Sequence, residues 1–451
     1  MSDEREQKQG RVADTVSGLL QGGTVPEARR MLNALHPAEI ADLLESFPVA
    51  ERKLLWELVE EENGGEVLLQ VNDEVRSGLI EEMDEAELLA ATSGMDVDDL
   101  ADFMQDLPKT LTGAILRSMD NQNRQRLEAV LAYPEDSAGG LMNTDTVTVR
   151  PDVSLDVVMR YLRMRGSVPE LTDHLFVVSR FDHFLGVLRV SDLLTRDPAS
   201  PVADVLDTEA VAIAADKPAR EVAKMFEDRD LISAPVLDER GRLIGRITVD
   251  DVVDVIRDEA ERSILTMAGL GDEADLFAPI WSSTRRRALW LGINLLTALL
   301  AAYVIGLFEG TIQQVVALAV LMPVVASMGG IAGTQTLTLV TRALALGQVA
   351  SRNTRALLIK ELGIGILNGL MWAAILAGIA VVWFGEPAIG AIIAAAMVIN
   401  LFVAGLSGVG VPLLLKRLGV DPALAGGVVL TTVTDVVGFM AFLGLATIFL
   451  I

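Results

Sequence analysis

Apolar residues dominate the chain from Ala288 to its end, in five stretches that are each long enough to cross a bilayer. A spanning helix needs about 20 residues, and the stretches lie at 288–308, 312–340, 357–384, 387–415 and 423–450. Basic residues precede the first stretch and fill alternate connections, whereas the other two loops carry only Glu309 and Glu386 as charges. Because basic loops stay on the cytoplasmic side, this alternation predicts a cytoplasmic amino terminus and an external carboxyl terminus.

Before Ala288 the apolar positions are spaced for short amphipathic helices, and one such segment occurs twice. Residues 35–48 recur as residues 95–108, at an offset of 60. The identical pairs are Ala41 and Ala101, Asp42 and Asp102, and Pro48 and Pro108. Repeated amphipathic helices that end at proline are typical of stacked helical hairpins, so we expect a small α-solenoid of about 130 residues.

A second repeat follows, and its pattern alternates between strands and helices. Residues 146–152 match 210–216, and residues 185–192 match 244–251. Each copy reads as a strand, a helix, two strands and a helix. This order resembles a pair of CBS domains, which are modules that regulate the protein to which they are attached.

Some CBS modules bind nucleotides through a Gly, a Ser or Thr three residues later, and an Asp three residues beyond that. The second copy matches this signature with Gly245, Thr248 and Asp251, whereas the first copy has Arg189 at the hydroxyl position. One interpretation is a site for ATP or a similar adenine nucleotide. The other is a turn in which Thr248 and Asp251 cap a helix. The sequence leaves both open.

Charge is distributed as unevenly as hydrophobicity. Residues 1–275 hold 57 of the 62 acidic side chains and 28 of the 37 basic ones. A region this negative is a poor partner for nucleic acid or anionic lipid and a natural one for cations, although acidity also serves solubility alone. The chain has no cysteine and three scattered histidines, which excludes thiolate metal sites and argues against zinc.

The expected helix over 248–265 leads from the second repeat toward the membrane and carries a stripe of carboxylates. Asp250, Asp254, Asp258 and Glu261 follow the i, i+4, i+8, i+11 spacing of one helical face. Such a stripe repels itself unless cations bridge it. A solvated acidic face is the alternative, but the position just before the membrane favours a cation sensor.

Asp435 is the acidic residue placed deepest in an expected span, and an ionisable group there costs about 3 kcal/mol unless it faces water, a partner or an ion. Thr431, Thr432 and Thr434 add oxygens beside it. Hydrated Mg²⁺ suits one or two carboxylates, and a two-fold dimer would pair Asp435 with its copy. A structural hydrogen bond between helices is the alternative. In the second span, Pro323 and nearby glycines predict an unwound segment that packs beside this helix.

Four segments resemble blocks of the MgtE family of magnesium channels: 133–142, 321–336, 411–425 and 431–439. The resemblance implies a homodimer in the bacterial inner membrane that takes up Mg²⁺ through paired Asp435 residues and serves magnesium homeostasis. It also implies regulatory Mg²⁺ sites, which we assign by position to Asp98, Asp102, Asp250, Asp258 and Glu261. Ile331 stands where the family usually has Asn, which leaves discrimination against Mn²⁺, Co²⁺ and Ca²⁺ open.

The expected architecture is a multidomain membrane protein. Its parts are an acidic helical domain (1–137), two α/β CBS domains (138–200 and 201–257), a linking helix (248–280) and a five-span all-α pore domain (281–451). The expected function is a Mg²⁺ channel gated by cytosolic Mg²⁺. The alternative is a coupled divalent-cation exchanger with CBS regulation. An enzyme is not expected, because no nucleophile with its base and no phosphate loop is present.

Overall fold

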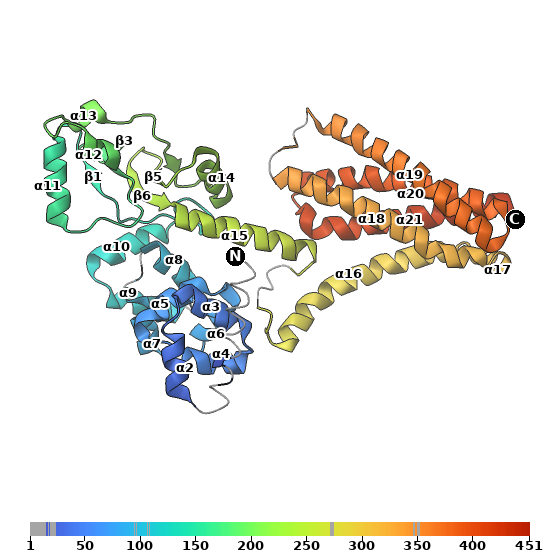
Figure 1. Ribbon diagram of the computed structural model, residues 1–451, viewed down its shortest axis with the longest axis horizontal. Coiled ribbons are helices and arrows are strands. Elements are labelled where there is room, and N and C mark those ends of the chain that lie inside the picture. The colour runs from blue at the N-terminus through green and yellow to red at the C-terminus, as the bar shows by residue number, and fades with distance from the viewer. Residues whose placement is uncertain are drawn as a thin grey trace. The chain divides into compact units, whose positions relative to one another are not determined.

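The computed structural model describes residues 15–16, 18, 24–93, 95, 97–105, 107, 109–270, 275–345, 348–349 and 352–451. The chain forms two compact units (Figure 1). The first unit consists of Met1–Glu261 and Glu273–Ala278, and the second of Arg262–Asp272 and Pro279–Ile451. We describe each unit by itself.

Short helices make up the beginning of the first unit. They are α2 (Val25–Leu32), α3 (Pro37–Ser46), α4 (Val49–Trp56), α5 (Glu61–Gln70), α6 (Asp73–Ile80), α7 (Glu85–Thr92), α8 (Val97–Gln105), α9 (Lys109–Ser118) and α10 (Asn121–Val130). Local sequence fixes several starts: Asp84 and Glu87 form a capping box at α7, and Asp120 caps α10. The repeated segments form α3 and α8, which pack against α5 and α10. The predicted helical repeat is confirmed.

Two small sheets follow, with identical topology. The first contains β1 (Thr148–Val149), β2 (His174–Val178) and β3 (Phe184–Arg189), and the second contains β4 (Ile213–Ala214), β5 (Ser233–Leu237) and β6 (Leu243–Thr248). In each sheet the first pair of strands is parallel and the second antiparallel, with a bulge near the end of the middle strand. The helices between and after them are α11 (Leu155–Arg165), α12 (Val190–Thr195), α13 (Val202–Val205) and α14 (Ala219–Arg229). The predicted order of elements is confirmed in both copies.

Helix α15 (Val249–Met267) begins directly after β6 and runs past the boundary between the two units. The second unit is helical: α16 (Ile280–Gly306), α17 (Glu309–Gln314), α18 (Ala317–Ala345), α19 (Thr354–Phe384), α20 (Pro387–Arg417) and α21 (Pro422–Leu450). Five of these helices are long and apolar enough to cross a membrane, with mean hydropathy between 1.7 and 2.4. The five predicted spans are confirmed, except that the short α17 takes up the start expected for the second.

The prediction of an unwound second span is wrong for the described residues, since α18 is one helix with Pro323 inside it. Its glycines serve close packing instead. A Cβ on Gly329 would lie 2.2 Å from Asn400 Nδ2 of α20, and a Cβ on Gly333 would lie 3.0 Å from the Leu430 side chain of α21. Glycine therefore lets neighbouring helices approach the α18 backbone, and α18 packs beside α21 as expected.

Candidate functional site

The first unit brings together carboxylates from α8 and from the first turn of α15. Asp98 and Asp102 lie one turn apart on α8, and Asp250 and Asp251 begin α15. The Asn143 side chain, from the segment before β1, donates to Asp98 Oδ1 at 3.1 Å. This group, which we call the acidic cluster, joins the helical repeat to the end of the second sheet.

Asp102 is the member of the acidic cluster with an oxygen that has no hydrogen-bond donor in the described residues. Burial raises its pKa to about 7, and the charges of Glu135, Asp98 and Asp73 add to the rise against the opposing effect of Arg76. Its Oδ1 is buried and accepts no hydrogen bond within the described residues. A buried carboxylate oxygen without a donor is an acceptor for an ion or for the water of a hydrated ion.

Asp251 is a second buried carboxylate whose charged form is disfavoured by burial and by neighbouring acids. Burial raises its pKa to about 8, and Asp98 and Asp250 raise it further, although hydrogen bonds from Thr248 oppose the shift. Asp98 belongs to α8, so the repulsion acts between two separate elements. At neutral pH without a cation, the cluster must either bind protons or push α8 and α15 apart.

No three His, Asp or Glu side chains in the described residues are close enough together to hold a metal ion as direct ligands. The acidic cluster therefore does not form a closed protein cage. It suits a cation that keeps its water and takes one or two carboxylates, as Mg²⁺ does.

The predicted stripe of carboxylates along α15 is interrupted by a basic residue, Arg257. Arg257 lies 3.8 Å from Asp254 and 3.6 Å from Asp258, measured from guanidinium nitrogen to carboxylate oxygen. Burial still raises the pKa of Asp254, with Arg257 opposing and Asp258 and Asp250 adding to the rise. Asp258 and Glu261 lie further along α15 and are exposed. The structure thus places Asp98 near Asp102, and it places Asp251, the neighbour of Asp250, near Asp98. Asp258 and Glu261 lie outside this cluster.

The nucleotide-signature residues have intramolecular roles. The Thr248 amide and hydroxyl both donate to Asp251 Oδ2 at 3.1 Å, and the hydroxyl also bonds Asp250. A Cβ on Gly245 would lie 2.8 Å from Met142 Sδ and 2.9 Å from the Asn143 carbonyl oxygen. Helix capping and packing thus account for these three residues. Sequence reasoning left Asp251 open between a nucleotide site and a helix cap, and it missed the place of Asp251 in the acidic cluster.

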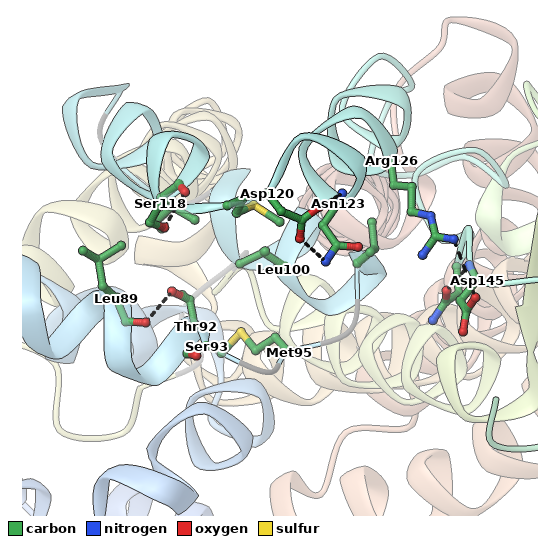
Figure 2. A pocket seen from close by; sticks show the side chains of 14 residues that line it. Leu89, Thr92, Ser93, Met95, Leu100, Ser118, Asp120, Asn123, Arg126 and Asp145 are labelled. Carbon is green, nitrogen blue, oxygen red and sulfur yellow. Dashed lines mark hydrogen bonds and ion pairs between the residues drawn. The ribbon is translucent and has the colours of Figure 1, made fainter. Parts of the chain in front are cut away.

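A cavity of about 500 Å³ flanks the acidic cluster, between α7, α8, α9, α10 and residues 143–145 (Figure 2). Leu89, Met95 and Leu100 form much of its wall. Of its acidic lining residues, Asp120 caps α10, and Asp145 pairs with Arg165 at 3.0 Å. Both carboxylates have partners, so the cavity itself offers no ready cation site.

In the second unit, Asp435 lies on α21 and is partly buried. No hydrogen bond or ion pair joins its carboxylate to another residue of the described chain. Thr431 and Thr432 donate to carbonyls one turn back on α21, which leaves their oxygens free to accept. Thr434 is fully buried and bonds Leu430 and Thr431, so it lies inside the bundle rather than on an open surface.

Sequence reasoning overlooked a second carboxylate within the spanning helices. Glu361 lies in the second turn of α19 and is 4% exposed. Thr336 of α18 donates to its Oε2 at 3.1 Å. Glu361 could have been found as an acidic residue inside the predicted span 357–384. It was not singled out because it follows Lys360 and lies near the start of that span, where charged residues are common. Ile331, the departure from the family pattern, is exposed on α18.

Comparisons with known proteins cover the whole architecture. Residues 322–445 match the family model MgtE, described as divalent cation transporter, and residues 35–136 match the MgtE intracellular N domain. Residues 138–198 and 202–258 match the CBS domain.

Relatives that match nearly the whole chain carry the same family name. A protein of Thermus thermophilus named magnesium transporter MgtE is 33% identical over 449 residues, which is 98% of this chain and 99% of that protein. A Bacillus subtilis protein of the same name is 27% identical and covers 96% of each chain. A solved structure of the cytosolic domain of the Mg²⁺ channel MgtE in complex with ATP is 31% identical, with a TM-score of 0.49, and covers 54% of this chain and 99% of that one. The chain belongs to the MgtE family of divalent-cation transporters.

Proposed function

We propose that this protein is a Mg²⁺ channel for Mg²⁺ uptake and that Mg²⁺ on the cytoplasmic side closes it by binding the acidic cluster. The names of the relatives that span the whole chain support Mg²⁺ as the transported ion. The observation that carries the gating proposal is the raised pKa of two carboxylates on separate elements, Asp102 on α8 and Asp251 on α15.

Electrostatic repulsion supplies the switch. Without a cation, charge on Asp98 of α8 and Asp251 of α15 repels the two helices from each other, and Asp102 adds repulsion against Asp98 within α8. A hydrated Mg²⁺ between them neutralises this charge and holds the two helices together. Helix α15 continues without a break to Met267, within the second unit. In this proposal, a displacement of its first turn reaches the second unit along α15.

Asp435 is the proposed ion site of the pathway. Its carboxylate is partly buried and without a partner in the described chain, and the Thr431 and Thr432 oxygens lie near it in the sequence. A homodimer would bring two Asp435 side chains to one axis, where they would face a hydrated cation. The proposed orientation in the bacterial inner membrane keeps the amino terminus in the cytoplasm.

Gly245, Thr248 and Asp251 stay a predicted site for ATP. Binding there would break the bonds from Thr248 to Asp251 and thereby change the acidic cluster. Calorimetry with ATP at fixed Mg²⁺ tests this, and Thr248→Val, which removes the hydroxyl, should abolish any heat of binding. No heat with the unaltered protein would refute nucleotide binding.

The gating proposal is tested by recording unitary currents from the full chain in planar bilayers while cytoplasmic Mg²⁺ is raised. Asp102→Asn and Asp251→Asn remove charge with little change of shape, so both should weaken the repulsion that opens the channel and shift the Mg²⁺ dependence of closure. Asp216→Asn, an exposed carboxylate of the same unit, is the matched control. Currents in which both variants respond to Mg²⁺ like the control would refute the proposal.

A coupled divalent-cation exchanger is the second candidate, and buried Glu361 favours it because coupling needs a second ion site. The same recordings discriminate between the two, since an exchanger carries no resolvable unitary current. Mg²⁺ flux without such currents would favour exchange.

A further inference from the structure

We propose that Glu361 forms the centre of a binding site for an alkali-metal cation inside the second unit, apart from Asp435. The Glu361 carboxylate accepts a hydrogen bond from Thr336 at 3.1 Å, and both residues are buried, at 4% and 6% exposure. A cavity of about 150 Å³ lies beside them, lined by residues of α18, α19 and α20. Its polar lining residues are Gln335, Thr336, Lys360, Glu361 and Asn368.

Glycines of α20 bring this helix close to Thr336 and Glu361. A Cβ on Gly408 would lie 2.6 Å from Thr336 Cβ, and a Cβ on Gly405 would lie 2.9 Å from the Glu361 carbonyl oxygen. Helix α20 therefore packs directly against Thr336 and Glu361, and Gly405 forms part of the cavity wall.

Lys360 is a weak and replaceable counter-ion of Glu361. Its Nζ lies 3.5 Å from Glu361 Oε1, longer than a good charge-assisted hydrogen bond, and its side chain is 66% exposed. The ammonium group is thus mostly in contact with the surroundings of the helix. It competes with a free cation for the same carboxylate without sealing it.

The donor set selects a monovalent cation. One carboxylate, one hydroxyl and the side-chain amides of Gln335 and Asn368 give a single negative charge and several neutral oxygens. A cation that contacts the buried Glu361 and Thr336 oxygens directly must shed part of its water, and Mg²⁺ does so reluctantly. An alkali cation sheds water readily and needs only one formal charge.

The surface around the cavity provides access. Gln335, Lys360 and Asn368 are exposed on helices that are long and apolar enough to cross a membrane. Polar side chains on a spanning surface are costly against hydrocarbon, so this side faces water or a second copy of the chain. Where this side faces water, ions reach Glu361 through the cavity.

The test uses the full chain in lipid nanodiscs and measures thermal unfolding while NaCl or KCl replaces N-methyl-D-glucamine chloride at constant ionic strength. Glu361→Gln keeps the shape and the acceptor for Thr336 but removes the charge. Lys360→Gln removes the tethered competitor. Arg355→Gln removes a basic charge from the first turn of the same helix, outside the cavity, and is the matched control.

We expect Na⁺ or K⁺ to raise the unfolding midpoint of the unaltered protein, and Glu361→Gln to abolish that rise. Lys360→Gln should lower the half-saturating concentration about fivefold, the equivalent of one partly exposed ion pair, whereas Arg355→Gln should not change it. A purely structural Glu361 would give no cation response and no gain from Lys360→Gln. No alkali effect, an effect that survives Glu361→Gln, or stronger protection by MgCl₂ through Glu361 would overturn the proposal.

The inference rests on the proposed transport function only in assuming that the second unit spans a membrane. Binding is measured at equilibrium, without current or flux. A failure of Mg²⁺ gating at the acidic cluster would leave the cation response intact, and the absence of that response would leave gating untouched.

Discussion

Replacing Arg52 by alanine should destabilise the first unit far more than any surface substitution. Arg52 and Asp275 form a bidentate ion pair, with Nη1–Oδ2 at 2.8 Å and Nη2–Oδ1 at 2.9 Å. Both residues are buried, at 4% and 6% exposure. The Arg52 Nε also donates to the Leu44 carbonyl at 2.9 Å. The pair ties residues 275–278, just before α16, to the helical repeat.

The magnitude follows from what the substitution leaves behind. Arg52→Ala strands a buried carboxylate, and breaking a buried pair from one side costs about 3–5 kcal/mol. Local opening at residues 275–278 should therefore become about a hundredfold more frequent, or more. Replacing both partners, as in Arg52→Met with Asp275→Leu, should cost much less because no charge stays buried.

Hydrogen–deuterium exchange of the full chain measures this opening at the Phe277 amide, which donates to Asp275 Oδ1 at 2.9 Å. Lys53→Ala is the matched control, since the neighbouring Lys53 pairs with Glu82 on the surface at 2.9 Å and such pairs contribute about 1 kcal/mol or less. If Arg52→Ala speeds exchange no more than Lys53→Ala does, the buried pair does not hold this segment.

The pair also predicts a response to acid. Burial would raise the pKa of Asp275, but hydrogen bonds from Arg52 and the Phe277 amide hold it below its usual value. The stabilisation is therefore present above the ordinary pKa of 3.8 and is lost as pH falls through the lower folded value. Arg52→Ala should remove this acid-dependent part of exchange at Phe277.

Other predictions concern the two proposed ion sites of the transport proposal, Asp435 and the acidic cluster, and the helix packing of the second unit. Asp435→Asn should lower Mg²⁺ uptake into liposomes about tenfold or more, the equivalent of one lost contact of about 1.4 kcal/mol; undiminished uptake would remove Asp435 from the pathway. Without Mg²⁺, the unfolding midpoint of the first unit should fall as pH rises from about 4 to about 8, because over this range Asp102 and Asp251, with folded pKa values of about 7 and 8 against an ordinary value of 3.8, keep a proton when folded and lose it when unfolded. Saturating Mg²⁺ should flatten this slope, and a slope unchanged by Mg²⁺ would count against the cluster. Gly438→Ala should destabilise the second unit by about 1–3 kcal/mol, since its Cβ would lie 2.8 Å from Asn400 Nδ2; calorimetric unfolding like that of the unaltered protein would contradict this.

The elements could be predicted because their signals are local. Five apolar stretches gave five long helices, and the strand–helix repeat gave two matching sheets, each bulged near the end of its middle strand. Spacing within one helix was equally readable, as for Asp98 and Asp102 on α8. Each of these features depends on neighbours within a few turns or within one repeat.

The pairing of distant elements could not be predicted in the same way. Arg52 and Asp275 are 223 positions apart, and no local pattern links them. Asp251 shares its electrostatic environment with Asp98 of α8, yet in the sequence it completed a nucleotide signature and a helix cap. One carboxylate fits several motifs at once, and only the tertiary neighbours decide which charges it meets.

The glycines of α18 and α21 show the same ambiguity within the membrane-spanning unit. A glycine-rich run in a span can unwind, or it can receive a neighbouring side chain, and the sequence pattern is alike in both cases. Here Gly329 and Gly438 both receive Asn400 of α20, which is fully buried and donates from Nδ2 to the Val325 carbonyl at 2.8 Å. One amide thus locks three helices together, and Gly438 follows Asp435 by less than one helical turn. The proposed ion site therefore lies beside a tightly packed contact. Rotation of α21 about its axis would replace Gly438 at this contact by a residue with a side chain, which would clash with Asn400 or push Asn400 away from the Val325 carbonyl.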